Sequence, residues 1–398
     1  MVQLSRSRTL QSATAAVKDA VQQLQAAGAT NAAEACDFLQ TLATTAFGRC
    51  ALGLGGFLEY ADGEMRAFLT ENAPSDDRVR EMSEVLLLLA DALVDEDNAM
   101  FAARFGAHPQ LVRLMEHENE LIQEAAATVV SSCTSTTTGV SFPHKVRQLG
   151  SVERNSPIAV PLPRDPRDGD SEHVQSVLIR QVPTRMTGQP KTGYLLWGAA
   201  FVLARWVHVH RELFYGKSVL EVGSGLGLGG ITAARYAQRT VLTDYQDDTC
   251  RALAYNVELN AGFIHEFDGV ASSAAGRPPV QVEHLDWDRM ETIKAEQKVD
   301  VIIACDIICE PSTAEGFLRV VRHRLARSGV AYLMNADSHS RFGVVHLHQL
   351  LAESAGELTY AITPVLAMSE GQLLLETVAD ARELAYEFYE IRLASPSS

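Results

Sequence analysis

Three acidic side chains in the second half of the sequence stand at the ends of short apolar runs. Glu221 lies near the end of 219–222, Asp244 closes a second run, and Asp306 follows 299–304. Each run has the length and composition of a strand buried in a parallel sheet. Because ligands bind outside the carboxyl ends of the strands in open α/β sheets, we expect these carboxyl groups at a ligand-binding edge.

A glycine-rich stretch connects the first of these runs to a helix. Residues 217–232 read KSVLEVGSGLGLGGIT, in which Gly223, Gly225 and Gly227 follow the apolar run directly. Glycine permits the tight turn and the close backbone approach that such a loop needs, and the start of the next helix offers free N–H groups. This order predicts a site for a nucleotide-like cofactor; a glycine-rich turn without a ligand is the alternative.

The acidic residue beside the glycine loop discriminates between cofactors. The spacing Gly225-x-Gly227-x-x-Gly230 also satisfies the dinucleotide fingerprint, but one turn after the strand has ended. The carboxylate of Glu221 would repel a pyrophosphate, whereas it suits a ligand that carries an ammonium and a sulfonium group. S-adenosylmethionine is such a ligand, and Asp244 then falls where a ribose diol is usually bound.

The E-x-G-x-G-x-G loop, with Asp244 as the second acidic contact, resembles that of the class I, seven-strand methyltransferases. The resemblance covers about 172–393. It implies a Rossmann-like α/β sheet with S-adenosylmethionine as cofactor. It also implies cofactor contacts from Glu221, Gly223, Gly225, Gly227 and Asp244.

Motifs on either side of the loop narrow the resemblance. A β segment at 172–181 precedes a T-G-x-x-x-W motif that ends at Trp197, and a later helix ends in Asn256-x-x-x-Asn260. This combination is similar to the protein-lysine methyltransferase subfamily that modifies elongation factors, chaperones and related substrates. In that family the tryptophan that matches Trp197 lies against the cofactor pocket, whereas an aromatic residue at a helix start ordinarily packs in a core.

The same resemblance assigns a role to Asp286 and Trp287, which follow the strand-like segment 280–282. In the family this pair lies at the adenine. A carboxylate can accept a hydrogen bond from the exocyclic amine, and an indole can cover the ring. A solvated aspartate beside a half-buried tryptophan is the alternative.

Asp306 stands where family members carry a D-x-x-Y motif, but this chain has Cys309 in place of the tyrosine. A lysine amine must lose its proton before it attacks a methyl group, so an aspartate that orients the amine beside an aromatic wall is a suitable arrangement. Cysteine supplies no such wall. We therefore expect Asp306 to hold the amine, with Trp197 or Tyr194 compensating for the missing ring. The alternative is that the reaction is slow or lost. Direct methyl transfer requires no cysteine nucleophile.

The first third of the sequence is helical in pattern and rich in alanine and leucine. Residues 101–133 resemble one armadillo-type repeat, and Glu81 aligns with Glu124 at an offset of about 43 residues. An ordinary helical bundle is the alternative. We predict an α-helical, armadillo-like or HEAT-like binding domain at 1–135, a Ser/Thr/Pro-rich linker at 136–170, and the methyltransferase domain at 171–398.

Composition limits the functions that remain. The chain has 398 residues, 46% of them hydrophobic, and a net charge of -16, which weighs against a broad nucleic-acid surface and favours a basic protein partner. The six cysteines form no C-x-x-C pair, no signal peptide or membrane-spanning run is recognisable, and the closely spaced histidines predict no metal site. We expect a cytoplasmic location, with the nucleus left open.

These observations favour an S-adenosylmethionine-dependent protein-lysine N-methyltransferase whose partner is a protein with an accessible lysine, recruited by the helical domain. Two alternatives stay open: a small-molecule methyltransferase on the same fold, and a catalytically weak scaffold in which the helical domain does the binding. A hydrolase triad from Asp337, Ser338 and His339 is disfavoured because adjacent residues cannot form one by themselves. The substrate protein, the degree of methylation and the oligomeric state are not readable from the sequence.

Overall fold

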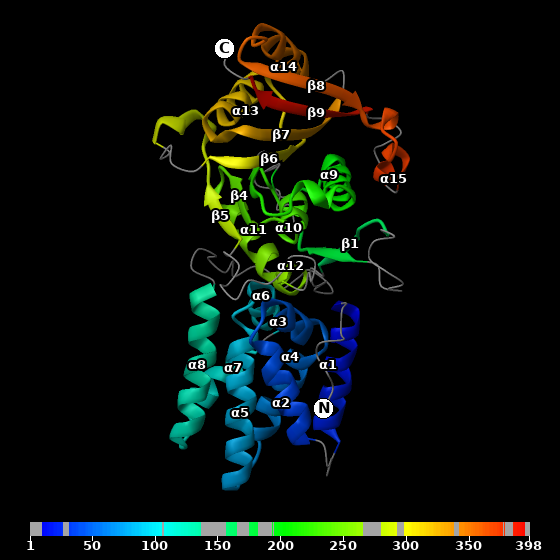
Figure 1. Cartoon of the computed structure of the whole chain (residues 1–398). Helices are drawn as coiled ribbons and strands as arrows, with labels where there is room; N and C mark the ends of the chain where they lie inside the picture. Colours follow the sequence, from blue (N-terminus) through cyan, green and yellow to red (C-terminus); the bar gives the residue numbers. More distant parts are fainter. Residues whose placement is uncertain are drawn as a thin grey trace. The chain divides into compact units, whose positions relative to one another are not determined.

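The computed structural model divides the chain into two compact units, Met1–Ser156 and Pro157–Ser398 (Figure 1). It describes residues 10–26, 32–105, 107–136, 157–164, 175–181, 193, 195–265, 280–292, 298–337, 342–376, 378 and 385–394. No helix in these ranges is both long enough and apolar enough to cross a membrane.

The first unit is helical, as predicted. Every third helix from α2 onward begins at a regular spacing. The helices α2, α5 and α8 begin 44 residues apart, at Ala32, Asp76 and Glu120. This spacing is close to the expected one, and the armadillo-like character of the unit stays a prediction. The described helices are α1 (Leu10–Gln25), α2 (Ala32–Ala43), α3 (Ala46–Leu54), α4 (Phe57–Phe68), α5 (Asp76–Ala92), α6 (Glu96–Phe105), α7 (His108–Met115) and α8 (Glu120–Thr136).

Local chemistry fixes the start of α5, the central helix of this unit. The Ser75 hydroxyl caps the helix by accepting a hydrogen bond from the Arg78 backbone N–H at 3.2 Å. The Arg78 guanidinium then binds Glu71 at 3.0 Å and Glu64 of α4 at 2.8 Å. These contacts tie the start of α5 to α4 and to the turn between them, so that α5 can bury Leu86 and its other apolar residues in the core.

The second unit is built on a seven-stranded sheet in the order β5-β4-β3-β6-β7-β9-β8. All neighbouring pairs from β5 to β7 are parallel, whereas β9 runs antiparallel to both β7 and β8. The predicted α/β sheet is therefore confirmed. The strands are β3 (Ser218–Val222), β4 (Arg239–Asp244), β5 (Gln281–His284), β6 (Val299–Cys305), β7 (Leu325–Asp337), β8 (Leu358–Pro364) and β9 (Ala385–Leu393).

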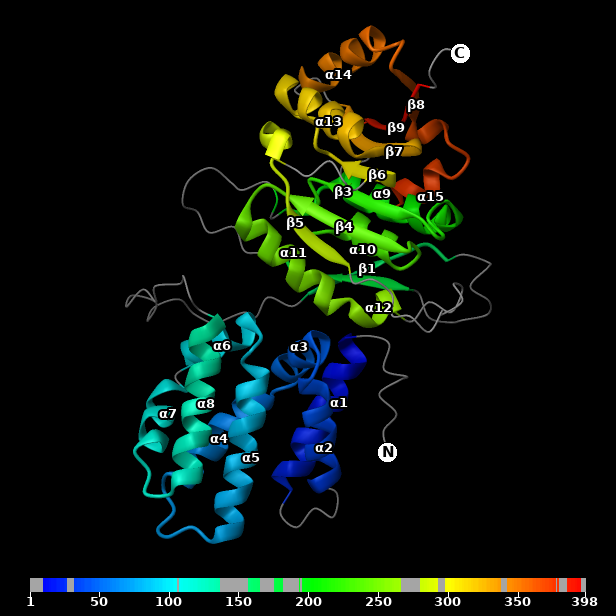
Figure 2. The same ribbon diagram turned by 60° about the vertical axis from the view of Figure 1, so that its left-hand side comes forward.

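Helices cover both faces of this sheet (Figure 2). On one face α13 (Pro311–Arg324) and α14 (Phe342–Glu353) pack through Phe317 and Leu347 against Leu220 and Ile302 of the central strands. The other face is covered by α9, α10 and α11. The described connections also include α12, α15 and three 3-10 turns, and the bounds are α9 (Gly198–Val209), α10 (Leu228–Ala234), α11 (Asp247–Leu259), α12 (Ala261–His265), α15 (Gly371–Leu375), η4 (Arg211–Leu213), η5 (Trp287–Thr292) and η6 (Val365–Ala367).

A two-stranded hairpin precedes the sheet and moves the domain boundary. Strand β1 (Ile158–Pro161) pairs antiparallel with β2 (Ser176–Ile179), so the second unit begins at Pro157, inside the segment expected to be a linker. The prolines around β1 suggested a linker, yet proline is compatible with a short edge strand. The remaining linker residues, 137–156 and 165–170, lie outside the described residues.

Asn256 of α11 and Asn260, the C-cap of this helix, hold the hairpin in place. The Asn260 side chain accepts a hydrogen bond from Leu178 N at 2.8 Å and donates one to Leu178 O at 2.7 Å. The Asn256 side chain accepts from Arg180 N at 2.9 Å and donates to Leu226 O at 3.0 Å. The two side-chain amides thus form hydrogen bonds with the backbone of β2 and the residue after it, as a neighbouring strand would. Asn256 also fixes the glycine loop, through its hydrogen bond to Leu226 O. This explains the Asn-x-x-x-Asn spacing, which places both side chains on one helix face.

Candidate active site

The glycine loop after β3 has the backbone conformation that only glycine adopts readily. Gly223, Gly225 and Gly227 have φ values of 64°, 53° and 86°. A Cβ atom at Gly223 would lie 2.7 Å from Cγ2 of Ile307 and 3.6 Å from Cζ2 of Trp287. The loop therefore brings its backbone against the residues that follow β5 and β6, and it forms a cradle that any side chain would fill.

The next two glycines serve a different purpose. A Cβ atom at Gly229 would lie 2.7 Å from Oε1 of Glu221, and one at Gly230 would lie 2.4 Å from Oε2. The Glu221 side chain is thus folded beneath the first turn of α10, where Oε1 accepts a hydrogen bond from the Gly230 N–H at 2.9 Å. These glycines make room for a buried carboxyl group.

Glu221 is 1% exposed, and no hydrogen bond to Oε2 is present in the described chain. Burial raises the pKa of Glu221 to about 8; the hydrogen bond from Gly230 acts in the opposite direction. The carboxyl group is consequently largely protonated at neutral pH, and its principal contact is the start of α10. A contact between Glu221 and a cofactor ammonium group stays a prediction.

Asp244, at the end of β4, faces the same loop. Its Oδ2 accepts a hydrogen bond from the Gly225 N–H at 3.2 Å, and its Oδ1 accepts one from Gln246 N at 3.2 Å. Burial raises the pKa of Asp244, while these backbone donors act to lower it. The expected contact with a ribose diol stays a prediction, but the structure places the carboxylate directly against the glycine loop.

Trp287 begins the 3-10 turn η5 after β5, and Asp286 directly precedes it. The Trp287 ring packs on Gly316 of α13, where a Cβ atom would be 2.9 Å from the ring, and the Trp287 carbonyl accepts a hydrogen bond from Arg319 at 2.8 Å. Asp286 Oδ1 accepts from Asp288 N at 3.0 Å. The indole therefore has a fixed place beside Gly223. The adenine contacts of both residues stay predictions.

Trp197 precedes the first turn of α9, and its side chain is 39% exposed. It is not a core residue, which was the alternative interpretation. The neighbouring backbone at Gly193 approaches the glycine loop, because a Cβ atom at Gly225 would lie 3.2 Å from Gly193 O. Gly193 of the T-G-x-x-x-W motif thus reaches the same edge of the sheet. Tyr194 lies outside the described residues.

Asp306 follows β6 in a conformation that is uncommon for a residue with a side chain. Its φ is 55°, in the left-handed region, which aspartate and asparagine tolerate better than most residues. Its backbone N–H donates to Met334 O at 2.9 Å, and its Oδ1 accepts from Ala336 N at 3.5 Å. Strained backbone of this kind occurs often at functional sites, where the surrounding structure maintains it.

The loop after Asp306 is held at several points. Thr313 Oγ1 accepts hydrogen bonds from Cys309 N at 3.1 Å and Glu310 N at 3.2 Å. Cys309 itself is exposed. Burial, followed by the nearby acidic side chains of Glu221 and Asp306, raises the pKa of Cys305 well above that of a free thiol. A thiolate nucleophile at Cys305 is therefore not favoured.

Two residues of this edge were not singled out in the sequence. Asn335, 1% exposed at the end of β7, accepts a hydrogen bond from Ile308 N at 3.1 Å and so fixes the loop after Asp306. Phe342 begins α14 and is 72% exposed. The N–H of the next residue, Gly343, donates to Cys309 O at 3.2 Å, so Phe342 lies at the rim of the Asp306 loop. The sequence does contain a sign of this role, since Asn335 is a polar residue directly after an apolar strand segment.

These residues fit S-adenosylmethionine. Three loop glycines leave a cradle without side chains, a buried aspartate stands at the end of β4, and an indole lies beside the loop. Acidic side chains and N–H groups around such a cradle suit an uncharged ribose and a cationic ligand better than a pyrophosphate. Among the described residues, no group of three or more metal-binding side chains is present.

Comparison with known proteins agrees with this geometry. Residues 183–342 match the family model described as lysine methyltransferase. This segment is thus similar to lysine methyltransferases. It includes the glycine loop, Asp244, Asp286, Trp287 and Asp306. The sheet order, with the last strand inserted antiparallel beside the fifth, is that of the class I methyltransferase fold.

Relatives of the methyltransferase segment include the protein-lysine N-methyltransferase EEF2KMT of Bos taurus, which is 32% identical over 153 residues, covering 35% of this chain and 44% of the relative. The histone-arginine methyltransferase METTL23 of Mus musculus is 29% identical over 163 residues, covering 39% of this chain and 55% of the relative. A solved O-methyltransferase from Bacillus cereus has 12% identity and a TM-score of 0.34, covering 53% of this chain and 84% of its own. The chain thus spans about half the length of these curated relatives.

Proposed function

We propose that the chain is an S-adenosylmethionine-dependent protein-lysine N-methyltransferase. The observation that carries the proposal is the convergence of the glycine cradle and the strained Asp306 at one sheet edge. The match of 183–342 to the lysine methyltransferase family supports the choice of acceptor. A protein with an accessible lysine is then the substrate.

Each element of the edge has a part in the proposed reaction. When bound, S-adenosylmethionine supplies a methyl group on a sulfonium sulfur, which keeps the electron pair of the broken C–S bond. The lysine nitrogen must first lose a proton, since its ordinary pKa is about 10.4. Asp306 accepts a hydrogen bond from the neutral amine and so directs the nitrogen lone pair toward the methyl group. Holding the two reactants in line supplies most of the rate.

Phe342 supplies the aromatic wall that Cys309 cannot. Its helix start is attached to the Cys309 backbone through Gly343, and a Cβ atom at Gly343 would lie 2.5 Å from Glu310 O. This close packing fixes where α14 begins. An exposed phenylalanine at the rim of the loop that follows Asp306 can cover the methylene chain of a lysine and exclude water from the amine.

Arginine is the second candidate acceptor, because one relative is named as a histone-arginine methyltransferase and matches over more of this chain than the lysine-modifying relative does. The same aspartate could bind a guanidinium group. Identification of the methylated amino acid in the product decides between the two acceptors.

For the helical unit we propose protein binding. The exposed surface of α5 combines the acidic residues Glu81 and Glu84 with Leu87, and Val94 follows in the turn after the helix; Leu87 and Val94 are each 47% exposed. Such a surface suits a partner segment with basic and apolar residues. A cytoplasmic location remains part of the proposal.

The decisive experiment uses the purified full chain, tritiated S-adenosylmethionine and a ribonuclease-treated cytosolic extract, with labelled proteins separated on a denaturing gel. Asp306→Asn is the test variant because asparagine keeps the left-handed backbone while removing the charge. Glu353→Gln, an exposed carboxylate near the end of α14, is the matched control.

We expect one labelled protein band that yields methyl-lysine on hydrolysis, falls at least 100-fold with Asp306→Asn, and is unchanged with Glu353→Gln. A band that yields methyl-arginine would select the second candidate. Intact cofactor binding without any labelled protein would contradict a protein methyltransferase and favour a small-molecule acceptor or a scaffold.

A further inference from the structure

Strand β8 (Leu358–Pro364) is the last strand at one end of the methyltransferase sheet. In the part of the chain that the structure describes, only β9 pairs with it. Leu358 is buried, but every residue from Thr359 to Pro364 is exposed or partly exposed. An edge strand of this kind presents backbone N–H and C=O groups to which another strand can bind.

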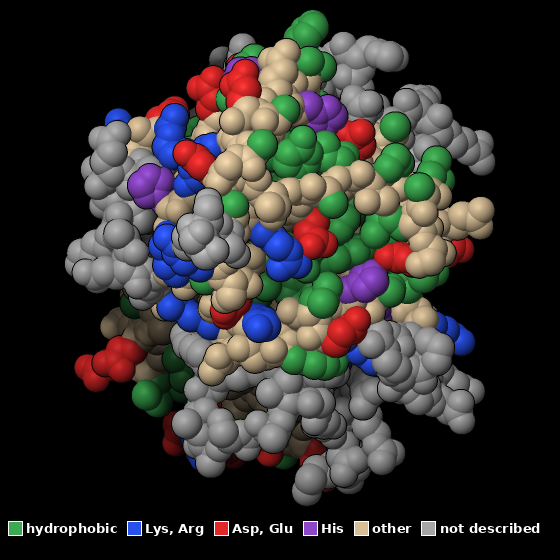
Figure 3. Space-filling model, turned by 45° about the horizontal axis from the view of Figure 1, so that its top comes forward, with side chains coloured by type: hydrophobic (Ala, Val, Ile, Leu, Met, Phe, Trp, Pro, Cys, Tyr) green, Lys and Arg blue, Asp and Glu red, His purple; other side chains and the backbone are tan. Residues whose placement is uncertain are grey.

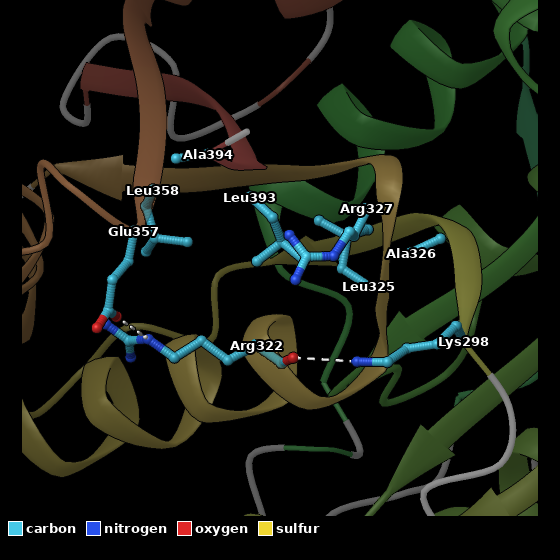
Figure 4. A pocket seen from close by; sticks show the side chains of 9 residues that line it. All are labelled: Lys298, Arg322, Leu325, Ala326, Arg327, Glu357, Leu358, Leu393 and Ala394. Carbon is cyan, nitrogen blue, oxygen red and sulfur yellow. Dashed lines mark hydrogen bonds and ion pairs between the residues drawn. The ribbon is translucent and has the colours of Figure 1, made fainter. Parts of the chain in front are cut away.

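The pairing of β8 with β9 determines which backbone groups face outward. Figure 4 shows one end of this ladder, where Ala394 N donates a hydrogen bond to Glu357 O at 2.7 Å. Hydrogen-bonded and non-hydrogen-bonded pairs alternate along an antiparallel ladder. Thr359, Ala361 and Thr363 therefore direct their N–H and C=O groups to β9, and the residues between them direct theirs outward.

Both ends of the outward-facing edge lack an open donor. The Leu358 N–H donates to Ser354 O at 2.8 Å and is not available to another strand. At the other end, Pro364 has no N–H group. The open donors of β8 are therefore those of Tyr360 and Ile362.

These open groups are symmetric about Ala361, which lies between the two residues. If a second copy of β8 lay antiparallel and centred on Ala361, Tyr360 of one chain would lie opposite Ile362 of the other. Each such pair exchanges two hydrogen bonds, so the open donors of both strands would all find acceptors. A two-fold axis at Ala361 produces this register, as an isologous contact requires.

The charge of β8 also permits contact with a second copy. The strand reads LTYAITP and carries no charged side chain, although the chain has a net charge of -16. Glu357, which precedes it, forms an ion pair with Arg322 at 3.3 Å (Figure 4). The opposite edge strand, β5, has only four residues and carries Glu283 and His284, and short charged strands resist pairing.

Apolar side chains accompany the open edge. Tyr360 is 42% exposed, and Leu366, two residues after β8, is 69% exposed. In the proposed register Tyr360 would pack on Ile362 of the second copy, an aromatic and β-branched pair that stabilises sheets. Figure 3 brings the top of Figure 1, where β8 lies, toward the viewer; hydrophobic side chains are exposed over the centre and right of this face, and Lys and Arg gather toward the left.

We propose that β8 is a self-association surface, at which two copies of this chain pair their β8 strands antiparallel about Ala361. The two sheets then form one continuous sheet across the two-fold axis. The uncharged strand offers nothing to select a basic partner, whereas its donors and acceptors match those of a second copy. Strands β9 and β7 separate β8 from β6, so the contact leaves the Asp306 loop accessible.

The test is sedimentation velocity of the full chain at physiological ionic strength, over about a hundredfold range of concentration. Ala361→Lys and Ala361→Glu are the test variants, because the register places residue 361 opposite itself in the non-hydrogen-bonded pair, where side chains are close. Ala261→Lys and Ala261→Glu are the matched controls, at an exposed alanine of α12.

We expect the wild-type mass to rise toward that of a dimer with concentration. Each Ala361 variant alone should dimerise about fivefold more weakly, because like charges then meet. An equimolar mixture of the two should dimerise at least as well as wild type, which also shows that both variants are folded. The Ala261 variants should behave as wild type.

Amide hydrogen exchange supplies a second measurement. The N–H groups of Tyr360 and Ile362 should exchange more slowly as the protein concentration rises, since pairing protects them. A chain that stays monomeric at every concentration would overturn the proposal. So would a dimer that both Ala361 variants leave intact, or a mixture that dimerises no better than either variant alone.

Discussion

Replacing the buried carboxyl group of Glu221 by an amide tests the electrostatics of the glycine loop. The group has an ordinary pKa of 4.5 and a folded-state pKa of about 8, raised by burial. Below pH 4.5 both the folded and the unfolded chain hold the proton. Between pH 4.5 and 8 only the folded chain holds it, so wild-type stability falls as the pH rises, by up to about 1.4 kcal/mol per pH unit. Above pH 8 the loss is complete.

Glu221→Gln removes this proton and keeps the hydrogen bond from the Gly230 N–H. Its free energy of unfolding relative to wild type should therefore increase by about 2–3 kcal/mol between pH 5.5 and 7.5. The new amide beneath α10 can also lower the free energy of unfolding by an amount that does not depend on pH. This amount cancels when the stability difference at pH 7.5 is compared with that at pH 5.5.

The chain offers a convenient probe for this measurement. Its three tryptophans, Trp197, Trp206 and Trp287, all lie in the second unit, so denaturant unfolding followed by tryptophan fluorescence reports on the methyltransferase domain. Glu353→Gln is the exposed control and should show no such pH dependence. If the difference between Glu221→Gln and wild type stays constant from pH 5.5 to 7.5, the Glu221 carboxyl group is not held neutral by burial and our reasoning is wrong.

Two further substitutions address the cradle and the wall of the site. Gly223→Ala should weaken S-adenosylmethionine binding at least tenfold and destabilise the second unit by about 1–3 kcal/mol, because φ is 64° and Ile307 occupies the space of a Cβ atom; Gly356→Ala, where the Cβ meets nothing within 4 Å, is the control. Equal effects of the two substitutions on cofactor binding would contradict the cradle. Phe342→Ala should raise the KM for the protein substrate about tenfold and leave cofactor affinity unchanged. The control Leu366→Ala, at another exposed apolar residue, should leave the KM unchanged. An unaltered KM for Phe342→Ala would exclude the proposed aromatic wall.

The parallel core of the sheet was predictable because its signals are local. A near-continuous apolar run at 299–304 matches β6 (Val299–Cys305), and the helix expected to end in Asn256-x-x-x-Asn260 is found as α11 (Asp247–Leu259). The positive φ values of the loop glycines also follow from composition, since few other residues adopt them. Each of these features depends on residues that are close in sequence.

What the sequence did not reveal depends on contacts between distant elements. The sequence predicts ligand approach for Gly223, Gly225 and Gly227, but it does not reveal that Gly229 and Gly230 leave room for Glu221. That assignment requires knowing which side of β3 the carboxyl group faces. Strand β1 was missed for a similar reason, because only its pairing with β2 distinguishes it from a proline-rich linker. The cofactor contacts of the site residues stay predictions.

The position of β9 also affects how the protein is made. β9 (Ala385–Leu393) separates β7 from β8, and β8 forms hydrogen bonds with no strand of the sheet other than β9. During synthesis the ribosome releases the glycine loop and the Asp306 strand long before β9 emerges. Until then β7 has an open edge and β8 has no partner, a state prone to aggregation. The helical unit is synthesised first and can fold before β9 has emerged. We therefore expect the nascent sheet to be the part that chiefly needs chaperone protection.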